Sequence, residues 1–451
     1  LGLIVLFAVP NAAALAVAAW MRRAAGWSWG VVLPVCWLPV EWVRTFGDLR
    51  MTADHIAYGV AKYPFFCQVA DVVGPYGVGA VVLATNGLLA DVWLAGGRRR
   101  LTGVASLVIL LGADLGYDAW AWHRWAEPVE ETVRVAIVQP NVAVDTKNDL
   151  STSVEQLRTL NRLTFEAADR GAELIVWPET ARPEPMYHWL DIPGTYRLPE
   201  ISPVARTLGV AMLIGSEYGQ VRTEDDYDFY NAAFAVHPDG TVDPVWAAKS
   251  YLVPFVEKTP LEALLGRLVR DRGGDWHWLS GGFREGPRAT VLPYEFGGVG
   301  VLVCFEQLFA DLPRTLTRAG AAFQVVVTND VWWGRTRFQG YQRDVLRLRA
   351  IENRTAFVRA ANTGISGFVD VRGRYRIEGP LFEEGLFVDD VPLREGWTPY
   401  VRYGDVVIGL AVIVLVIGVG IGRRRSAARP AAPSAGVGVV VGPAEGTDPP
   451  R

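Results

Sequence analysis

Three residues with chemically reactive side chains each follow a run of residues typical of a β-strand. They are Glu179, Lys249 and Cys304. In layered α/β folds, ligands gather at the carboxyl ends of the strands, so residues that follow strands tend to face one site. The sequence therefore predicts that these three side chains converge, although sequence spacing alone does not establish it.

Together the three side chains would form a site for acyl transfer. Cys304 supplies a nucleophilic thiol, and a helix starting there together with a nearby cation would favour the thiolate. Glu179 would take the thiol proton and later return it. The ammonium of Lys249, with the backbone N–H that follows the cysteine, would hold the oxyanion of a tetrahedral intermediate.

Each residue also has a simpler interpretation. A lone cysteine such as Cys304 is more often a small buried apolar residue. Glu179 would serve equally well as a helix or turn cap, and Lys249 as a solvated surface charge. The residues alone therefore only suggest a catalytic site.

The middle of the chain has the pattern of a layered α/β domain. Short apolar runs predict strands, and apolar residues three and four positions apart predict helices. Thr152 and Glu155 form a capping-box signature at the start of the first helix. Strands that alternate with helices, followed by hairpins, indicate a domain of about 260 residues with its own core. The predicted strands are 133–139, 173–177, 210–216, 231–236, 241–246, 299–303, 324–328, 356–361 and 367–371, and a further helix is predicted at 339–353.

The overall composition excludes several classes of protein. Half of the 451 residues are hydrophobic, with 44 basic and 48 acidic residues. The mean hydropathy of +0.17 argues against a disordered chain and against a purely soluble enzyme. Three cysteines and five histidines disfavour a disulfide scaffold and a histidine-rich metal site. A net charge of −4 lacks the excess of positive charge that nucleic-acid-binding proteins usually carry.

The apolar excess is concentrated in five segments. Each is close to the about 20 apolar residues that cross a bilayer, and the alternative is a buried core helix. The fourth segment is the weakest because Asp114 interrupts it. The five segments are 1–20, 24–40, 72–90, 101–120 and 406–422.

Three arginine clusters orient these segments. They lie at 22–23, 98–100 and 423–425. If all five segments span the membrane, the clusters share one face, which the positive-inside rule makes cytoplasmic. If the fourth did not span, the first two clusters and the last would lie on opposite sides. The consistent arrangement places the polar stretch between Trp122 and Tyr400 outside the cytoplasm.

These patterns divide the chain into four parts. Transmembrane helices are predicted in 1–125, a catalytic domain in 126–400 and a C-terminal transmembrane helix in 401–425. The remainder, 426–451, is rich in Ala, Pro and Gly and is predicted to be a disordered cytoplasmic tail. Because Leu1 begins inside an apolar run, we expect further spans to precede it.

Several motifs, in order, resemble the nitrilase superfamily. They are Trp-Pro-Glu-Thr at 177–180, the Lys249 segment with Leu-Val-Pro-Phe, and Cys-Phe-Glu at 304–306, followed by 328–334, 349–353 and 362–366. Membrane segments on both sides of the domain, with the stretches 41–44 and 68–77, are similar to one family within it, the apolipoprotein N-acyltransferases. The resemblance covers nearly the whole chain apart from the tail.

The resemblance implies an αββα sandwich outside the cytoplasm with a Glu-Lys-Cys triad and no cofactor or metal. Glu179 would be the general base, Lys249 would stabilise the oxyanion, and Cys304 would be the acylated nucleophile. Glu257 matches a second glutamate that positions the lysine and balances its charge; the alternative is an exposed charge. The resemblance also places Tyr230, Asn231, Phe305 and Glu306 at the site.

One position departs from the family. The family usually has a Lys-Trp pair after the first strand, whereas here Lys147 precedes Asn148. This departure puts in doubt an aromatic contact to acyl chains at the entrance of the site.

The function implied is acyl transfer in two half-reactions through a thioester on Cys304. A phospholipid would be the donor, and the α-amine of an N-terminal diacylglyceryl-cysteine of a lipoprotein would be the acceptor. The enzyme would lie in the bacterial inner membrane with its catalytic domain on the periplasmic side. The alternatives are a membrane-tethered amidohydrolase acting on a small amide or nitrile, and a transporter or scaffold with a degenerate domain.

Overall fold

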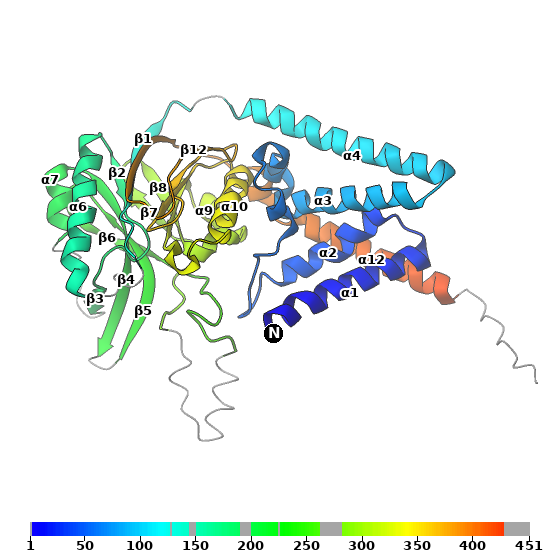
Figure 1. The fold of residues 1–451 in the computed structure, drawn as a ribbon, viewed down its shortest axis with the longest axis horizontal. Helices are drawn as coiled ribbons and strands as arrows, with labels where there is room; N and C mark the ends of the chain where they lie inside the picture. The colour runs from blue at the N-terminus through cyan, green and yellow to red at the C-terminus, as the bar shows by residue number, and fades with distance from the viewer. Residues whose placement is uncertain are drawn as a thin grey trace, which may run out of the picture.

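The structure is a computed structural model. It describes residues 2–126, 129–143, 150–189, 200–223, 226–261 and 282–427. The Lys147-Asn148 pair and nearly all of the predicted tail lie outside the described residues. A two-sheet α/β sandwich sits at one end of a bundle of apolar helices (Figure 1).

The first sheet has the order β13-β1-β2-β4-β5-β6, with β3 paired to β4. Its strands β1, β2 and β4 run parallel, and β13, β5 and β6 add antiparallel edges. The strands are β1 Thr132–Gln139, β2 Leu174–Val176, β3 Met186–Trp189, β4 Ala211–Thr223, β5 Asp226–Val236, β6 Val242–Ala248 and β13 Gly385–Pro392.

The second sheet has the order β12-β11-β10-β9-β8-β7 and a parallel centre, β8-β9-β10. The strands are β7 Val291–Tyr294, β8 Gly297–Val303, β9 Ala321–Thr328, β10 Phe357–Ala361, β11 Gly367–Val369 and β12 Tyr375–Glu378.

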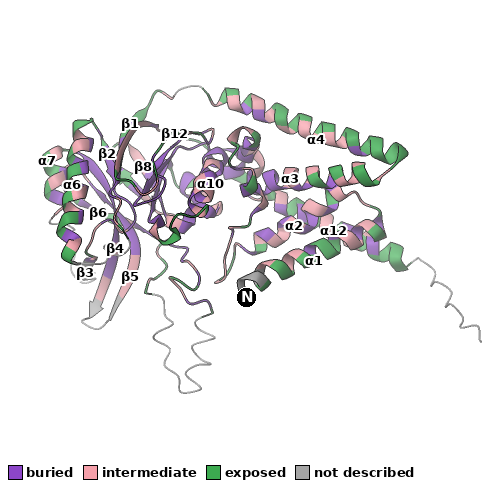
Figure 2. Ribbon diagram, viewed as in Figure 1, coloured by how far each residue is buried: buried purple, intermediate pink, exposed green. Residues whose placement is uncertain are grey.

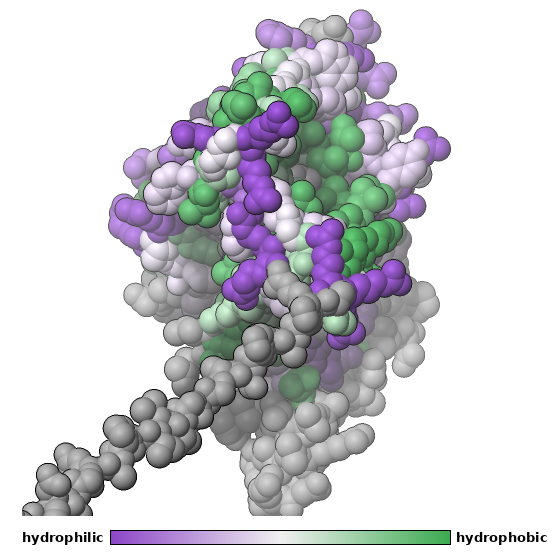
Figure 3. Space-filling view, turned by 90° about the vertical axis from the view of Figure 1, so that its right-hand side faces the viewer, coloured by the Kyte–Doolittle hydropathy of each residue, from purple (hydrophilic) through white to green (hydrophobic). Residues whose placement is uncertain are grey.

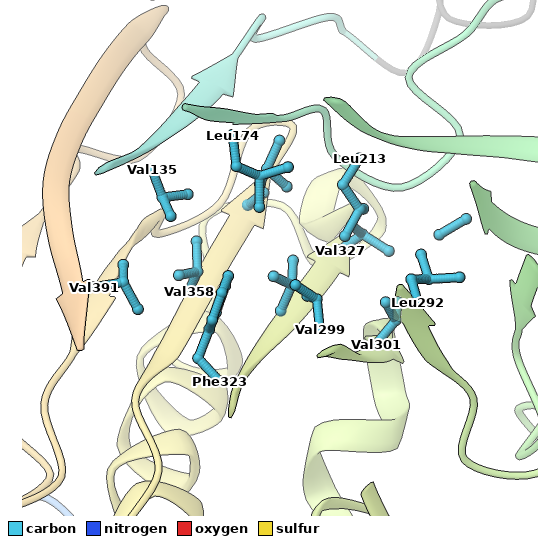
Figure 4. Packing of buried hydrophobic residues seen from close by; sticks show 14 of the residues in the cluster. Val135, Leu174, Leu213, Leu292, Val299, Val301, Phe323, Val327, Val358 and Val391 are labelled. Atoms are coloured by element: carbon cyan, nitrogen blue, oxygen red, sulfur yellow. The ribbon is translucent and has the colours of Figure 1, made fainter. Parts of the chain in front are cut away.

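Each sheet is buried on both faces, which explains why its central strands are continuous apolar runs. Along β1, Val135 and Ile137 face the opposite sheet, whereas Ala136 and Val138 face the covering helices. Figure 4 shows the core between the sheets, where valines and leucines from both interdigitate. Helices α6 Ser153–Asp169 and α7 Ser202–Leu208 cover the first sheet, and α9 Asp311–Arg318 and α10 Phe338–Asn353 cover the second. The predicted αββα sandwich is therefore confirmed.

Two details of the sequence-based expectation are different in the structure. β4 continues to Thr223, beyond the predicted end at 216, because its pairing with β5 extends past the apolar run that predicted the strand. The predicted capping box at Thr152 is wrong. A 3-10 turn, Leu150–Thr152, already gives Thr152 helical backbone angles, so its side chain makes no cap hydrogen bond and instead accepts one from Gln156.

Five apolar helices form the bundle. They are α1 Gly2–Ala25, α2 Trp29–Val43, α3 Ala70–Leu94, α4 Gly97–Arg124 and α12 Val406–Ala427, with short turns η1 Ile56–Gly59 and η2 Pro64–Cys67 between α2 and α3 and the short helix α11 Pro399–Tyr403 before α12. By length and composition, α3, α4 and α12 are able to cross a membrane, and α2 is apolar but only 15 residues long. Much of the surface of α4 and α12 is exposed (Figure 2). That α1 and α2 also span remains a prediction.

The three arginine clusters lie at the end of the bundle away from the sandwich (Figure 1). Arg22 Nη1 lies 2.5 Å from Asp91 Oδ1, which ties the end of α1 to the end of α3. Arg425 Nη1 donates to the carbonyl of Ala25 at 2.5 Å, which brings the end of α12 to the same place. Figure 3, which looks onto this end, shows hydrophilic side chains gathered among hydrophobic ones. The clusters therefore share one end, as the charge argument requires.

A buried arginine joins the bundle to the sandwich. Arg354, at the end of α10, donates from Nε to Asp71 Oδ2 at 2.8 Å and from Nη1 to Gln68 Oε1 at 2.8 Å. Tyr117 of α4 donates to the other oxygen of Asp71 at 2.8 Å. Because α3, α4 and the sandwich meet at one carboxylate, the domain is held at a fixed position over the end of the bundle.

Replacing Arg354 with Met should destabilise the protein by about 3–5 kcal/mol, because Asp71 would remain buried without its partner. Arg170→Met is the matched control: Arg170 forms an exposed pair with Glu166 on α6, so its loss should cost less than about 1 kcal/mol. Thermal unfolding in detergent measures both, and adding Asp71→Asn to Arg354→Met should recover part of the loss. Equal effects of the two arginine variants would contradict the role given to this junction.

Candidate active site

Cys304 lies at a sharp turn between β8 and the 3-10 helix η5 Cys304–Leu308. Its φ of 55° is in the left-handed region, which a non-glycine residue adopts only when the surroundings hold it there. The carboxylate of Glu306 provides that support, because it accepts a hydrogen bond from Val303 N at 2.8 Å. The turn thus presents the thiol at the end of a buried strand.

The same carboxylate fixes the segment that carries the lysine. Glu306 Oε1 accepts hydrogen bonds from Ser250 N at 2.7 Å, Ser250 Oγ at 2.8 Å and Tyr251 N at 3.0 Å. Lys249, directly before Ser250, donates its own backbone N–H to Asn231 O on β5 at 2.8 Å. The lysine backbone is therefore held from both sides.

Lys249 is a buried cation with a dedicated partner. Its side chain is 1% exposed, and Nζ lies 2.7 Å from Glu257 Oε1. The second oxygen of Glu257 accepts a hydrogen bond from Val253 N at 2.8 Å. Glu257 is thus an ion-pair partner rather than an exposed charge, and Lys249 is not a surface residue.

Glu179 follows β2 and Pro178 and is buried. Its Oε1 accepts a hydrogen bond from Asn231 Nδ2 at 2.6 Å, and its Oε2 accepts one from Asn329 N at 2.6 Å. Gly215 on β4 leaves room for this turn, since a Cβ there would lie 2.1 Å from Pro178 O. The carboxylate is therefore aimed inward by contacts from both sheets.

The charges of the three predicted residues act on one another. Burial, and after it the charge of Glu179, raises the pKa of the Cys304 thiol to about 12 against the opposing charge of Lys249. Burial by itself lowers the pKa of Lys249, but Cys304, Glu257 and Glu179 outweigh it and hold that pKa above its usual value. The three side chains therefore lie close enough for the charges of Glu179 and Lys249 to shift the pKa of Cys304.

The expected stabilisation of a thiolate is not present in this arrangement. The helix after Cys304 is a 3-10 helix of only 5 residues, which has little dipole to offer. Burial and the nearby carboxylates outweigh the single ammonium, so this arrangement favours the thiol over the thiolate. A reaction at Cys304 therefore needs a base to remove its proton, and Glu179 is the carboxylate whose charge acts on it most strongly.

A cavity of about 230 Å³ lies beside Glu179 and Glu257, whereas Lys249 and Cys304 are not among the described residues of its wall. Asn231 also lines it, as do Thr180, Asn329 and Trp332 from the recognised motifs. Val256 and Trp332 contribute exposed apolar surface, with 76% and 69% of their area accessible. The wall residues that lie outside the recognised motifs are Glu217, Val256, Gly282 and Phe283.

Three residues that the resemblance placed at the site are, like Lys249 and Cys304, not among the described residues of the cavity wall, and their role at the site stays a prediction. The Phe305 ring packs against Phe309 with centroids 5.2 Å apart. Tyr230 packs against Trp246 at 5.1 Å, and Glu306 binds backbone N–H groups as described above. Among the described residues, no group of three or more His, Cys, Asp and Glu side chains is arranged to hold a metal ion.

Replacing Glu179 with Gln should make Cys304 ionise at lower pH. Removing the negative charge takes away one of the two largest causes that raise the pKa of the thiol, so the thiolate fraction at a given pH increases. Alkylation of Cys304 by iodoacetamide, followed by mass spectrometry across a pH series, should shift toward neutral pH. Glu217→Gln, in the same cavity wall, is the control and should leave the profile in place. A profile that does not move in the Glu179 variant would contradict this electrostatic assignment.

Comparisons with known proteins agree with this geometry. Residues 134–396 match the carbon-nitrogen hydrolase family, and residues 1–88 match the apolipoprotein N-acyltransferase N-terminal domain. A protein of Geobacter metallireducens named apolipoprotein N-acyltransferase is 32% identical over 392 residues, which cover 85% of this chain and 73% of the relative. A protein of the same name from Methylococcus capsulatus is 29% identical, with 94% and 81% covered.

Solved structures of the nitrilase superfamily are also similar. A Saccharomyces cerevisiae member of branch 10 aligns with 17% identity and a TM-score of 0.44, covering 59% of this chain and 92% of the other. An amidase from Nesterenkonia sp. aligns with 19% identity and a TM-score of 0.43, covering 63% and 98%. From the family matches and the relatives together, the chain belongs to the apolipoprotein N-acyltransferase family and carries the carbon-nitrogen hydrolase domain between its apolar helices.

Proposed function

We propose that the chain transfers an acyl group from a phospholipid to the α-amine of the N-terminal diacylglyceryl-cysteine of lipoproteins. The relatives' shared name supports an apolipoprotein acceptor and acyl transfer to nitrogen. The observation that supports the mechanism is the partly buried Cys304 thiol, which lies within the electrostatic influence of a carboxylate and an ammonium. The turn that begins with Cys304 also contacts the segment between α2 and α3, because the Leu308 carbonyl accepts hydrogen bonds from Thr52 and Tyr58.

The first half-reaction forms a thioester. Glu179 accepts the thiol proton as Cys304 Sγ attacks the ester carbonyl of the phospholipid, since burial disfavours a free thiolate beforehand. Lys249 Nζ, with a backbone N–H at the turn, stabilises the oxyanion. When the intermediate collapses, the C–O bond breaks, and Glu179 returns the proton to the departing lysophospholipid.

The second half-reaction releases the acyl group to an amine. The α-amine attacks the thioester carbonyl and Glu179 accepts a proton from the nitrogen; as the C–S bond breaks, Glu179 passes that proton to the departing sulfur, which regenerates the thiol of Cys304. Water that reached the thioester at this stage would hydrolyse it and release the acyl group as a free fatty acid. The apolar surfaces of Val256 and Trp332 in the cavity wall favour a lipid chain over water there.

A membrane-tethered amidohydrolase would use the same three groups and let water resolve the acyl-enzyme. Two observations favour transfer to a lipoprotein instead. The relatives that match over most of the chain are named apolipoprotein N-acyltransferase, and three described helices are able to cross a membrane. A soluble amide gains nothing from such anchoring.

Incubation of the purified protein with a phospholipid labelled in its acyl chain should trap the label on Cys304. The bond should be cleaved by neutral hydroxylamine, as expected for a thioester, and the label should be absent from Cys304→Ala. Cys67→Ala provides the control, because Cys67 is a buried cysteine in the core of the junction and should leave trapping intact. Label that persists in Cys304→Ala would overturn the mechanism, and rapid hydrolysis of short amides without any lipid would favour the alternative.

We also propose that the sandwich lies on the periplasmic side of the bacterial inner membrane. The support is the position of the three arginine clusters at the opposite end of the bundle, which the positive-inside rule assigns to the cytoplasm.

Cysteine labelling in intact cells tests this orientation. A membrane-impermeant maleimide should label Arg162→Cys on the exposed face of α6 and should not label Arg424→Cys at the end of α12 until the membrane is opened. The reverse pattern would place the catalytic domain in the cytoplasm and contradict the proposal.

A further inference from the structure

The bundle contains an apolar cavity larger than the catalytic one. It has a volume of about 590 Å³, lies between α1, α2 and α12, and is called here the bundle groove. Such a volume is within the ~300–1,000 Å³ typical of ligand sites. Its wall includes Ala13 and Val17 of α1, Val40 and Val43 of α2, Leu415 of α12, and Phe46 after α2. Val43 and Phe46 are 62% and 56% exposed, so the groove is open at this side.

The open side of the groove faces the sandwich. The residues of α2 in its wall, from Cys36 to Val43, lie in the half of that helix that leads toward the catalytic domain. Beyond the helix end, Arg44 lines the groove and forms an ion pair with Asp54. The apolar wall is thus bounded by charge where the bundle meets the sandwich.

A second, polar cavity of about 300 Å³ adjoins the groove at Phe46, which lines both. Arg50 and Arg288 flank one aromatic ring in its wall, with their Cζ atoms 4.2 and 5.5 Å from the centroid of Tyr251. Both guanidinium groups also have acidic neighbours. Arg50 lies 3.8 Å from Glu285, which also binds Lys258, and Arg288 pairs with Asp311.

An apolar groove that opens onto two guanidinium groups matches the chemistry of one class of ligand, a lipid with apolar chains and an anionic phosphate. We propose that the groove and the polar cavity together form a docking site for one phospholipid of the bilayer. Its acyl chain lies along α1, α2 and α12, and its phosphate lies in the polar cavity, whose wall includes Arg50 and Arg288.

The docking site shares a stretch of chain with the proposed catalytic residues. Ser250 and Tyr251 line the polar cavity and directly follow Lys249. Glu285 and Gly286 line it as well, close in sequence to Phe283 of the catalytic cavity wall. We assign the docking site to the phospholipid donor before it enters the catalytic cavity, and not to its position during the reaction. This assignment rests on the proposed function.

Photo-cross-linking tests the docking site without turnover. Full-length Cys304→Ala protein in lipid nanodiscs is irradiated with a phosphatidylethanolamine that carries a diazirine in its acyl chain, and the labelled peptides are identified by mass spectrometry. The label should be found on the groove residues of α1, α2 and α12, and Ala13→Trp, which fills the groove, should reduce it at least about fivefold. Ala12→Trp, exposed on the same helix but outside the groove wall, should not reduce it.

Kinetics in the otherwise unmodified chain tests the phosphate contact. Arg50→Gln should raise the KM for phospholipid about tenfold and change kcat by less than about twofold, because the contact is made before the chemical step. Arg318→Gln is the control, since Arg318 also stacks on an aromatic ring, that of Trp397, but lies outside the polar cavity.

The docking site would be overturned if no label were found in the groove, or if Ala13→Trp and Ala12→Trp reduced the labelling equally. An unchanged KM for phospholipid in Arg50→Gln would also overturn it. Because the cross-linking uses Cys304→Ala, it does not depend on acyl-enzyme formation. Failure of thioester trapping in the wild type would instead count against the proposed function, so the two failures are distinguishable.

Discussion

The buried carboxylate of Glu306 is the interaction on which the geometry of the site depends. It accepts hydrogen bonds from Val303, before the cysteine, and from Ser250 and Tyr251, after the lysine. Burial raises the pKa of Glu306, and these N–H donors oppose that effect by stabilising the charged form. One carboxylate therefore sets the distance between the end of β8 in one sheet and the end of β6 in the other. Without it, the left-handed turn at Cys304 would lose its side-chain support, and Lys249 would be held only by Asn231, Gly286 and Glu257.

The balance of charge around Cys304 follows from that geometry. One ammonium is buried beside two carboxylates, Glu179 and Glu257, and Glu257 is committed to the ammonium as its ion-pair partner. Glu179 is left to interact with the thiol, and its proximity raises the pKa of the thiol instead of lowering it. These charges favour the thiol over a stored thiolate, which suits the proton transfer to Glu179 that the proposed mechanism requires. A partly buried thiol with a raised pKa reacts slowly with alkylating and oxidising agents.

Much of the fold could be predicted because the central strands are buried on both faces. Runs such as 299–303 and 325–327 are apolar without interruption, and the structure has strands β8 and β9 there. The outer part of β4 has no such run, because only Tyr218 among its residues contributes a buried apolar ring, and so the place of Glu217 in the cavity wall was missed. The residue types of the site were evident from the sequence, but the protonation state of Cys304 was not, since a pKa depends on distances between charges that sequence spacing does not contain.

Other residues in the recognised motifs serve the site indirectly. Asp330 is buried with Arg359, with Oδ2 and Nη2 2.9 Å apart, and Gly364 has no space for a side chain because a Cβ would lie 1.9 Å from Asp330 Oδ2. This packed ion pair fixes the turn after β9, where the backbone N–H of Asn329 holds Glu179. A sequence shows such residues only as part of a motif, because their contribution is to hold a neighbour and not to react.

The position of the sandwich on the bundle is fixed by a buried carboxylate as well. Arg354 and Asp71 set the position of the domain relative to α3 and α4, just as Glu306 sets the two sheet ends relative to each other. Phospholipid esters lie near the surface of a bilayer, and their chains do not leave it without a large cost in apolar exposure. In the proposed reaction, a thiol held rigidly at the end of the bundle would shorten the path that such an ester has to travel. A mobile domain would gain reach but would lose the orientation that an attack on a carbonyl requires. On the proposed function, rigid attachment of the sandwich would therefore serve the reaction as well as holding the domain at the membrane.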